Sequence, residues 1–262
     1  MLEVADIHCR LGHRTILHDI SARFAPGLFH VILGPNGSGK STFLKIFSGD
    51  LRPTQGVVRY DGRPLEPGHV PALARVRAVM SQSPDIQFPL PVADIVMMGR
   101  YPHFNLTPTA RDRAICAEAM EAVSIAGLAA RDYQTLSGGE KQRVQFARAL
   151  SQVWEPAPTG NRFLFLDEPI SSLDIRYQHQ FLHLAREQAS QGLVVIAVLH
   201  ELNIALQYAD TLLFMKAGRL VAHIPTIDVN AALLTAIYDI PVHLIPTPFG
   251  PSPLAVYHPP VI

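Results

Sequence analysis

The sequence has few cysteines, no long apolar run and no excess of charge of either sign. Its 262 residues include only Cys9 and Cys116, too few and too far apart for a disulfide framework or a zinc site, so a reducing compartment is expected. The longest purely apolar run, residues 193–199, is strand-length, whereas a membrane helix needs about 20 residues. A formal net charge of zero argues against a nucleic-acid partner. Acidic residues interrupt the N-terminus, so we expect no signal peptide.

Short apolar runs alternate with segments of helical character, which predicts an α/β fold. Most of the apolar runs are unbroken, as is typical of strands buried on both faces of a parallel sheet, and they span residues 29–33, 77–82, 163–166 and 193–200. Helices are expected between them, at residues 40–48, 108–124 (with Thr107 as cap and Pro108 in the first turn), 139–152 and 174–191. Alternating residues before position 27 predict antiparallel strands.

These patterns predict one domain with three parts and a tail. Residues 1–87 and 136–225 are expected to form the core with its N-terminal antiparallel β subdomain, and residues 88–135 an inserted helical subdomain. The tail, residues 226–262, is rich in proline and histidine and is expected to be irregular. We interpret His223, His243 and His258 as surface or packing residues rather than ligands.

The segment GPNGSGKST matches the phosphate-loop pattern G-x-x-x-x-G-K-[ST], follows a predicted strand and precedes a predicted helix. Backbone N–H groups of such a loop form a nest for phosphates, and side chains in place of its glycines would block the approach. We expect Lys40 to contact the phosphates and Ser41 to ligate Mg²⁺. The predicted nucleotide-binding residues of this phosphate loop are Gly34, Pro35, Asn36, Gly37, Ser38, Gly39, Lys40, Ser41 and Thr42.

Two carboxylates, Asp167 and Glu168, follow the apolar run at 163–166, at the strand end where open α/β sheets bind ligands. We expect Asp167 to hold Mg²⁺ and Glu168 to act as the general base on the attacking water.

A second anion-binding helix terminus is predicted at LSGGEKQR, where a Ser-Gly-Gly turn opens a helix. If one nucleotide lay between the two termini, Lys40 of one copy would face the LSGGE segment of another, and a two-fold homodimer would contain two such sites. The residues assigned to this second terminus are Ser137, Gly138, Gly139 and Glu140.

Taken in order, GPNGSGKST, LSGGEKQR, FLFLDEP, SSLD and a histidine after an apolar strand resemble the ATP-binding cassette ATPases, over roughly residues 1–225. The resemblance implies a phosphate-loop NTPase core, with ATP and Mg²⁺ as ligands. It further implies that Gln82 contacts Mg²⁺ or the attacking water, that Asp174 lies in an inter-subunit loop, and that His200 touches the γ-phosphate. The family's adenine-stacking aromatic position aligns with Cys9, which has no π-face.

The resemblance also favours one branch of this family. Residues 88–104 resemble the permease-docking region in cassettes of siderophore, cobalamin and haem importers, and the loop after Trp154 with SSLDIRYQH resembles cassettes that serve haem. It implies a homodimer under two permease subunits, served indirectly by a substrate-binding protein, at the cytoplasmic face of the bacterial inner membrane. Two alternatives stay open: a ferric-siderophore or cobalamin importer, and a soluble regulatory ATPase that does not take part in transport.

Overall fold

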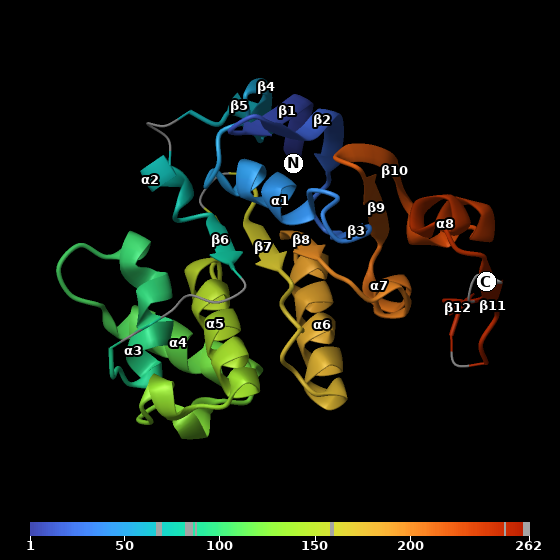
Figure 1. Ribbon diagram of the computed structural model, residues 1–262. Coiled ribbons are helices and arrows are strands. Elements are labelled where there is room, and N and C mark those ends of the chain that lie inside the picture. The colour runs from blue at the N-terminus through green and yellow to red at the C-terminus, as the bar shows by residue number, and fades with distance from the viewer. Residues whose placement is uncertain (67–69, 82–85, 87, 158–159, 249, 259–262) are drawn as a thin grey trace.

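The computed structural model describes residues 1–66, 70–81, 86, 88–157, 160–248 and 250–258 and is built around a six-stranded sheet (Figure 1). Its strand order is β10-β9-β3-β8-β7-β6. Neighbouring strands are parallel except for β10, which pairs antiparallel with β9. The strands are β3 (Phe29–Leu33), β6 (Arg77–Met80), β7 (Phe163–Asp167), β8 (Val194–Val198), β9 (Thr211–Lys216) and β10 (Arg219–Pro225).

Every residue of β3, β7 and β8 is buried, which confirms the prediction of strands covered on both faces. Successive side chains of a strand point to opposite faces. Accordingly, Phe165 packs with α1 (Lys40–Ser48) and the N-terminal strands, while Leu164 and Leu166 pack with α5 (Gly138–Gln152) and α6 (Ile175–Ser190). The sheet is therefore the middle layer, and α1 lies on the opposite face from α5 and α6.

The N-terminal antiparallel sheet is also present, with strand order β2-β1-β4-β5, and forms the upper lobe in Figure 1. Its strands are β1 (Leu2–Leu11), β2 (Arg14–Phe24), β4 (Gln55–Tyr60) and β5 (Arg63–Pro64). One face of this sheet closes over α1, since Leu2, Ile7 and Phe24 share a core cluster with Phe43 and Phe47. This packing fixes the start of α1 against the β lobe.

The predicted helices are present, with corrected ends. The helix expected at 108–124 is α4 (Ala110–Ala122), and Thr109 caps it instead of Thr107, so Pro108 precedes the helix. The Thr109 hydroxyl accepts from the Asp112 N–H while the Asp112 carboxylate accepts from the Thr109 N–H, a reciprocal capping box. The remaining helices are α2 (Val70–Leu73), α3 (Val92–Met97), α7 (Leu202–Tyr208) and α8 (Ala231–Tyr238), with short 3₁₀ turns at Met98–His103, Ala126–Leu128, Tyr133–Thr135 and Thr226–Asp228.

Helices α3, α4 and α5 lie together at the lower left of Figure 1, below the sheet. A buried ion pair ties this group together: the Arg100 guanidinium donates to Asp112 at 3.0 Å, and their side chains are 3% and 6% exposed. Arg100 also donates to the Ser151 carbonyl of α5 at 2.8 Å. Val92, Ile95 and Val96 are fully buried, so the inner face of α3 is core.

The expectation of an irregular tail is wrong. Residues 231–238 form α8, capped by Asn230, and a hairpin follows, made of β11 (Val242–Ile245) and β12 (Leu254–Tyr257). The described prolines of the segment lie before and between these strands, where a missing N–H costs no ladder hydrogen bond. The elements lie at the right edge of Figure 1, away from the helical group. Among the described residues, no helix is both long and apolar enough for a membrane crossing.

Candidate functional site

The phosphate loop, residues 34–42, joins β3 to α1, as the sequence predicts. Its backbone needs glycine. Gly34 has φ +149° and a Cβ there would lie 2.0 Å from the Met215 carbonyl oxygen; Gly39 has φ +96°, and a Cβ would lie 2.6 Å from Leu17 Cδ2. The loop is thus shaped by close neighbours rather than by flexibility, and it leads directly into the N-terminus of α1, where helix N–H groups can bind an anion.

Lys40 is 5% exposed and is tied to its own loop. Its ammonium donates to the carbonyl oxygens of Gly34 at 2.9 Å and Pro35 at 3.1 Å. Burial lowers the pKa of Lys40, and the charges of Glu168 and Asp167 oppose that shift. The site therefore holds a buried ammonium group beside two carboxylates, and the ammonium supplies positive charge for an incoming polyphosphate.

The residues predicted to hold Mg²⁺ come together in part. The Ser41 hydroxyl donates to Asp167 Oδ1 at 3.0 Å, although 126 positions separate them in the chain. Burial raises the pKa of Asp167, whose side chain also feels the negative charge of Glu168. A hydroxyl and a carboxylate are the hard oxygen ligands that Mg²⁺ prefers, and a divalent cation would offset the cost of burying this carboxylate. The third predicted ligand, Gln82, lies outside the described residues.

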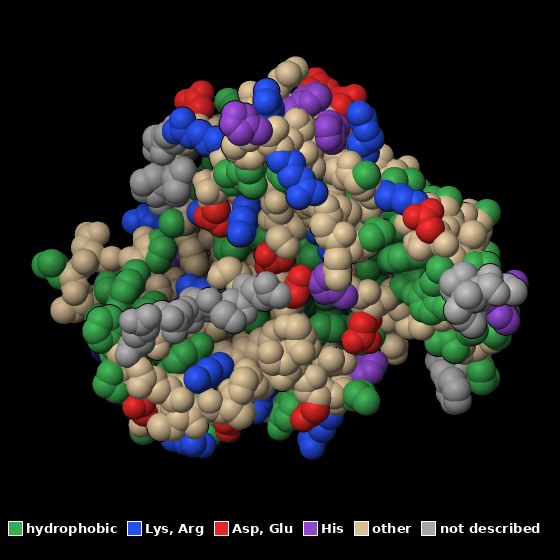
Figure 2. Space-filling view, in the orientation of Figure 1, with side chains coloured by type: hydrophobic (Ala, Val, Ile, Leu, Met, Phe, Trp, Pro, Cys, Tyr) green, Lys and Arg blue, Asp and Glu red, His purple; other side chains and the backbone are tan. Residues whose placement is uncertain are grey.

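Glu168 and His200 meet beside this pair. The Nε2 atom of His200 donates to Oε1 of Glu168 at 2.5 Å, and Glu168 adopts a left-handed backbone with φ +50° at the end of β7. The Glu168 N–H donates to the Val198 carbonyl of β8 at 3.2 Å, which fixes the turn to the neighbouring strand. The parallel order β8-β7 therefore brings both side chains to one edge of the sheet. Acidic and histidine side chains are seen close together in the middle of the face shown in Figure 2.

A hollow of about 300 Å³ lies at this edge. Two of its lining residues, Arg14 and Ile16 on β2, were not identified from the sequence. The others belong to the predicted site and are Asn36, Gly37, Gly39, Lys40, Ser41, Thr42, Glu168 and His200. Arg14 and Ile16 immediately follow the β1–β2 turn. The turn was the feature of the sequence from which their position near the phosphate loop could have been suspected.

Cys9, which aligns with the family's adenine-stacking position, does not face a base in this chain. Cys9 is fully buried among the core residues of the β lobe, and burial raises the pKa of its thiol. The side chain therefore packs inward and cannot face a base at the surface. Leu11, paired with Arg14 across the turn, is 48% exposed and lies nearer the strand end.

The LSGGE segment opens α5 through a capping box. The Ser137 hydroxyl accepts from the Glu140 N–H at 3.3 Å, and the Glu140 carboxylate accepts from the Ser137 N–H at 2.8 Å. This backbone hydrogen bond is the main cause that lowers the pKa of Glu140. Ser137 and Gly138 are exposed, and among the described residues none of positions 137–140 lines the hollow at Lys40. Within one chain, the two helix termini thus face separate spaces.

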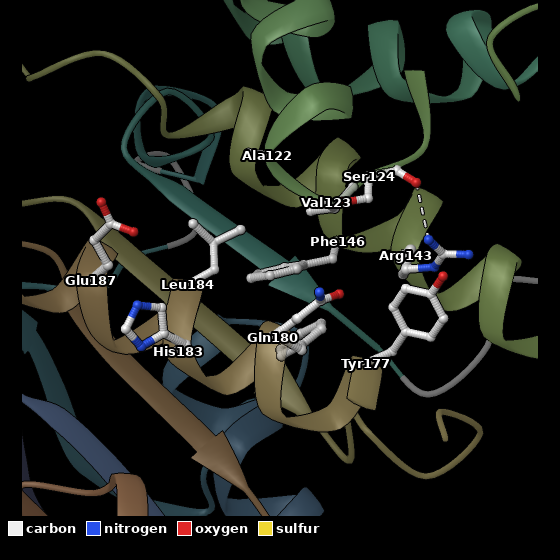
Figure 3. A pocket seen from close by; sticks show the side chains of 11 residues that line it. Ala122, Val123, Ser124, Arg143, Phe146, Tyr177, Gln180, His183, Leu184 and Glu187 are labelled. Atoms are coloured by element: carbon white, nitrogen blue, oxygen red, sulfur yellow. Dashed lines mark hydrogen bonds between the residues drawn. The ribbon is translucent and has the colours of Figure 1, made fainter. Parts of the chain in front are cut away.

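Asp174 caps α6, since its carboxylate accepts from the Tyr177 N–H at 3.1 Å. A further hollow of about 230 Å³ lies between α5 and α6, away from the phosphate loop (Figure 3). At this hollow the Phe146 and Phe181 rings stack with centroids 3.7 Å apart, and the Arg143 guanidinium lies 4.0 Å from the centre of the Tyr177 ring. These contacts join α5 to α6.

Comparison with known proteins decides the family. The family model described as ABC transporter matches residues 17–171, more than half of the chain. The chain belongs to the ABC transporter family. ABC ATPase domains bind ATP and in general require Mg²⁺, and those of importers in general work as dimers with a membrane permease.

Curated relatives match nearly the whole of this ABC ATPase. A protein of Gloeobacter violaceus (strain ATCC 29082 / PCC 7421) named "Hemin import ATP-binding protein HmuV" is 45% identical over 99% of this chain and 90% of its own length. A protein of the same name from Methylobacillus flagellatus (strain ATCC 51484 / DSM 6875 / VKM B-1610 / KT) is 40% identical over 97% of this chain and 95% of its own length.

Solved structures agree with the fold. An ABC transporter of the metal-chelate type, in an inward-facing conformation, matches with a TM-score of 0.81 and 25% identity and covers 98% of this chain and 96% of its own. A dimeric bacterial ABC transporter cassette matches with a TM-score of 0.75 and 23% identity, covering 86% and 99% respectively, which supports the phosphate-loop NTPase fold.

Proposed function

We propose that this ABC ATPase hydrolyses ATP to energise haem import through a membrane permease and works as a nucleotide-sandwich homodimer. The observation that carries the hydrolytic part is the meeting of Lys40, the Ser41–Asp167 pair and the Glu168–His200 pair around one hollow. The names of the relatives, with identities of 40–46%, support haem as the cargo.

Different residues of the site would bind the triphosphate, hold Mg²⁺ and activate the attacking water. The nest and Lys40 bind and orient the triphosphate, while Ser41, Asp167 and, by family resemblance, Gln82 would hold Mg²⁺. When bound, Mg²⁺ neutralises charge on the phosphates. Glu168 orients the attacking water and accepts its proton, and the hydrogen bond from His200 Nε2 to Oε1 helps to fix the orientation of the carboxylate. By family resemblance, His200 would also contact the γ-phosphate.

The exposed N-terminus of α5 supports the sandwich dimer. Ser137 and Gly138 present a helix N-terminus to solvent, apart from the hollow at Lys40. A two-fold arrangement would bring the LSGGE segment and Asp174 of one protomer to the phosphate loop of the other, completing two nucleotide sites. ATP would close the two protomers, and hydrolysis would open them.

We infer that the permease contact lies at residues 88–104. Phe88 is 73% exposed and Tyr101 57%, and Leu106, two residues beyond the segment, is 95% exposed, so large apolar side chains are accessible here to a partner. Asp94 lies on the exposed face of α3 while Val92, Ile95 and Val96 hold the other face in the core. The protein would thus be a peripheral subunit at the cytoplasmic face of the bacterial inner membrane, and a substrate-binding protein would act on the far side.

Reconstitution tests the function. The chain and candidate permeases are placed in proteoliposomes, and ATP-dependent uptake of haem, a ferric siderophore and cobalamin is compared, with Lys40→Ala protein as the control. We expect uptake of haem alone. Uptake of the siderophore or cobalamin instead would assign the alternative cargo class. ATP hydrolysis without any permease association would point to the regulatory ATPase.

A further inference from the structure

Gln142 links the LSGGE helix to the loop that carries the general base. From the second turn of α5 its Nε2 donates to the Glu168 carbonyl oxygen at 3.3 Å. Its Oε1 accepts from the Ser172 N–H at 3.1 Å. One side-chain amide thus joins both ends of residues 168–172, and no role for it follows from the assignments above.

The loop at Glu168 depends on such support. Glu168 has φ +50°, a conformation that non-glycine residues adopt only when neighbours over-determine it. Its carbonyl oxygen also accepts from the Ser171 hydroxyl at 3.2 Å. The carbonyl group and the side chain of Glu168 belong to one residue, so a rotation of the backbone that moves the carbonyl also changes the direction of the carboxylate.

The position of Gln142 on α5 makes it sensitive to the helix terminus. It lies five residues after Ser137, so a shift of the capped terminus is carried along about one and a half turns of helix. Farther along, the Phe146–Phe181 stack fastens α5 to α6 (Figure 3). Gln142 lies between the capped terminus and that stack, so a displacement of the terminus would reach Gln142 before the stack.

We propose that Gln142 is a positioning residue which couples occupancy of the LSGGE terminus to the alignment of Glu168 in the same chain. The inference rests on the proposed dimer, in which that terminus contacts the nucleotide held by the partner. Each nucleotide would thereby help to place the general base of the opposite site, so hydrolysis is cooperative in ATP.

Gln142→Met is the test variant, because methionine has a similar length and lacks both hydrogen bonds. Gln178→Met is the matched control: Gln178 donates to the Ile170 carbonyl at 3.3 Å, in the same loop, but from α6 rather than from the LSGGE helix. Hydrolysis rate against ATP concentration is measured for the full-length parent and both variants, with ATP affinity by calorimetry and thermal melting as a check on folding.

We expect Gln142→Met to lower kcat by about tenfold, the effect of two neutral hydrogen bonds on the base alignment, and to bring the Hill coefficient to about 1. ATP affinity should stay within about twofold, because Gln142 does not touch the hollow at Lys40. Gln178→Met should keep the cooperativity of the parent. Should Gln142→Met melt at a lower temperature, Gln142→Glu serves in its place, since it keeps the acceptor for Ser172 and lacks the donor for Glu168.

Two results overturn the proposal alone: a Hill coefficient unchanged by the Gln142 variant, or one lost equally in Gln178→Met. A parent that hydrolyses ATP without cooperativity overturns the coupling as well. A parent that neither hydrolyses ATP nor dimerises with it would instead overturn the proposed function, so the two failures are distinguishable.

Discussion

Replacing Glu168 by glutamine isolates the proposed general base. The amide has the size of the carboxylate, and its oxygen can still accept from His200 Nε2, so the 2.5 Å contact at the strand ends can persist. What is lost is the capacity to take a proton from water. Loss of one general base slows chemistry by about 10²–10⁴-fold, which corresponds to about 2.7–5.4 kcal/mol in the activation barrier.

The assay is single-turnover hydrolysis at saturating Mg-ATP, with calorimetry for binding and light scattering for mass. We expect the Glu168→Gln protein to bind ATP like the parent, to hydrolyse it at least a hundredfold more slowly, and to accumulate as a closed dimer. Glu187→Gln, an exposed glutamate on α6, is the control and should match the parent. Hydrolysis by Glu168→Gln within a few fold of the parent would remove Glu168 from the role of base.

Three other changes probe separate parts of the molecule. Lys40→Ala should abolish measurable ATP binding in calorimetry, because it removes the buried cation of the loop; binding that survives would contradict its phosphate role. Asp112→Ala removes one of the two carboxylates paired with the buried Arg100, which keeps Glu155 at 3.1 Å, and should cost about 1.5–3 kcal/mol in urea unfolding. Burial alone would raise the pKa of Asp112, but bonds from Thr109 and Arg100 lower it below 3.8, so this stabilisation is present above that pH and is lost as pH falls below it. Asp94→Lys should reduce permease-stimulated hydrolysis and leave ATP affinity unchanged; intact transport would contradict the proposed docking face.

The parallel strands and the phosphate loop could be predicted because local pattern and chemistry agree there. Residues 29–33 are apolar except for His30 and are buried throughout, and the glycines at 34 and 39 occupy positions where a Cβ would collide with neighbours. The meeting of Ser41 with Asp167 and of Glu168 with His200 needs only that parallel strands end at one edge of the sheet.

The errors came from features that local pattern does not determine. The alternation of residues along a β-strand shows which side chains point inward only where the pairing with the neighbouring strand is regular. In β1 the pairing with β2 shifts on either side of Ile7 and of Cys9. The inward orientation of Cys9 could therefore not be predicted from its position in the sequence. Prolines in the tail suggested irregular structure, yet they lie outside the strands of the β11–β12 hairpin. The bridging role of Gln142 depends on two contacts made 26 and 30 positions away, which no motif encodes.

The claim that nucleotide is bound between two protomers is tested most directly by mixing two inactive variants. Lys40→Ala disables the phosphate loop. Gly138→Asp disables the LSGGE terminus, because it puts a negative charge where the phosphates of the nucleotide would bind. The substitution should not disturb the fold, because a Cβ at this position would lie 3.7 Å from its nearest neighbour, Ser172. A mixed dimer would pair the intact loop of one chain with the intact terminus of the other. The account predicts ATP hydrolysis by the mixture well above the sum of the separate proteins, and a mixture as inactive as its components would contradict it.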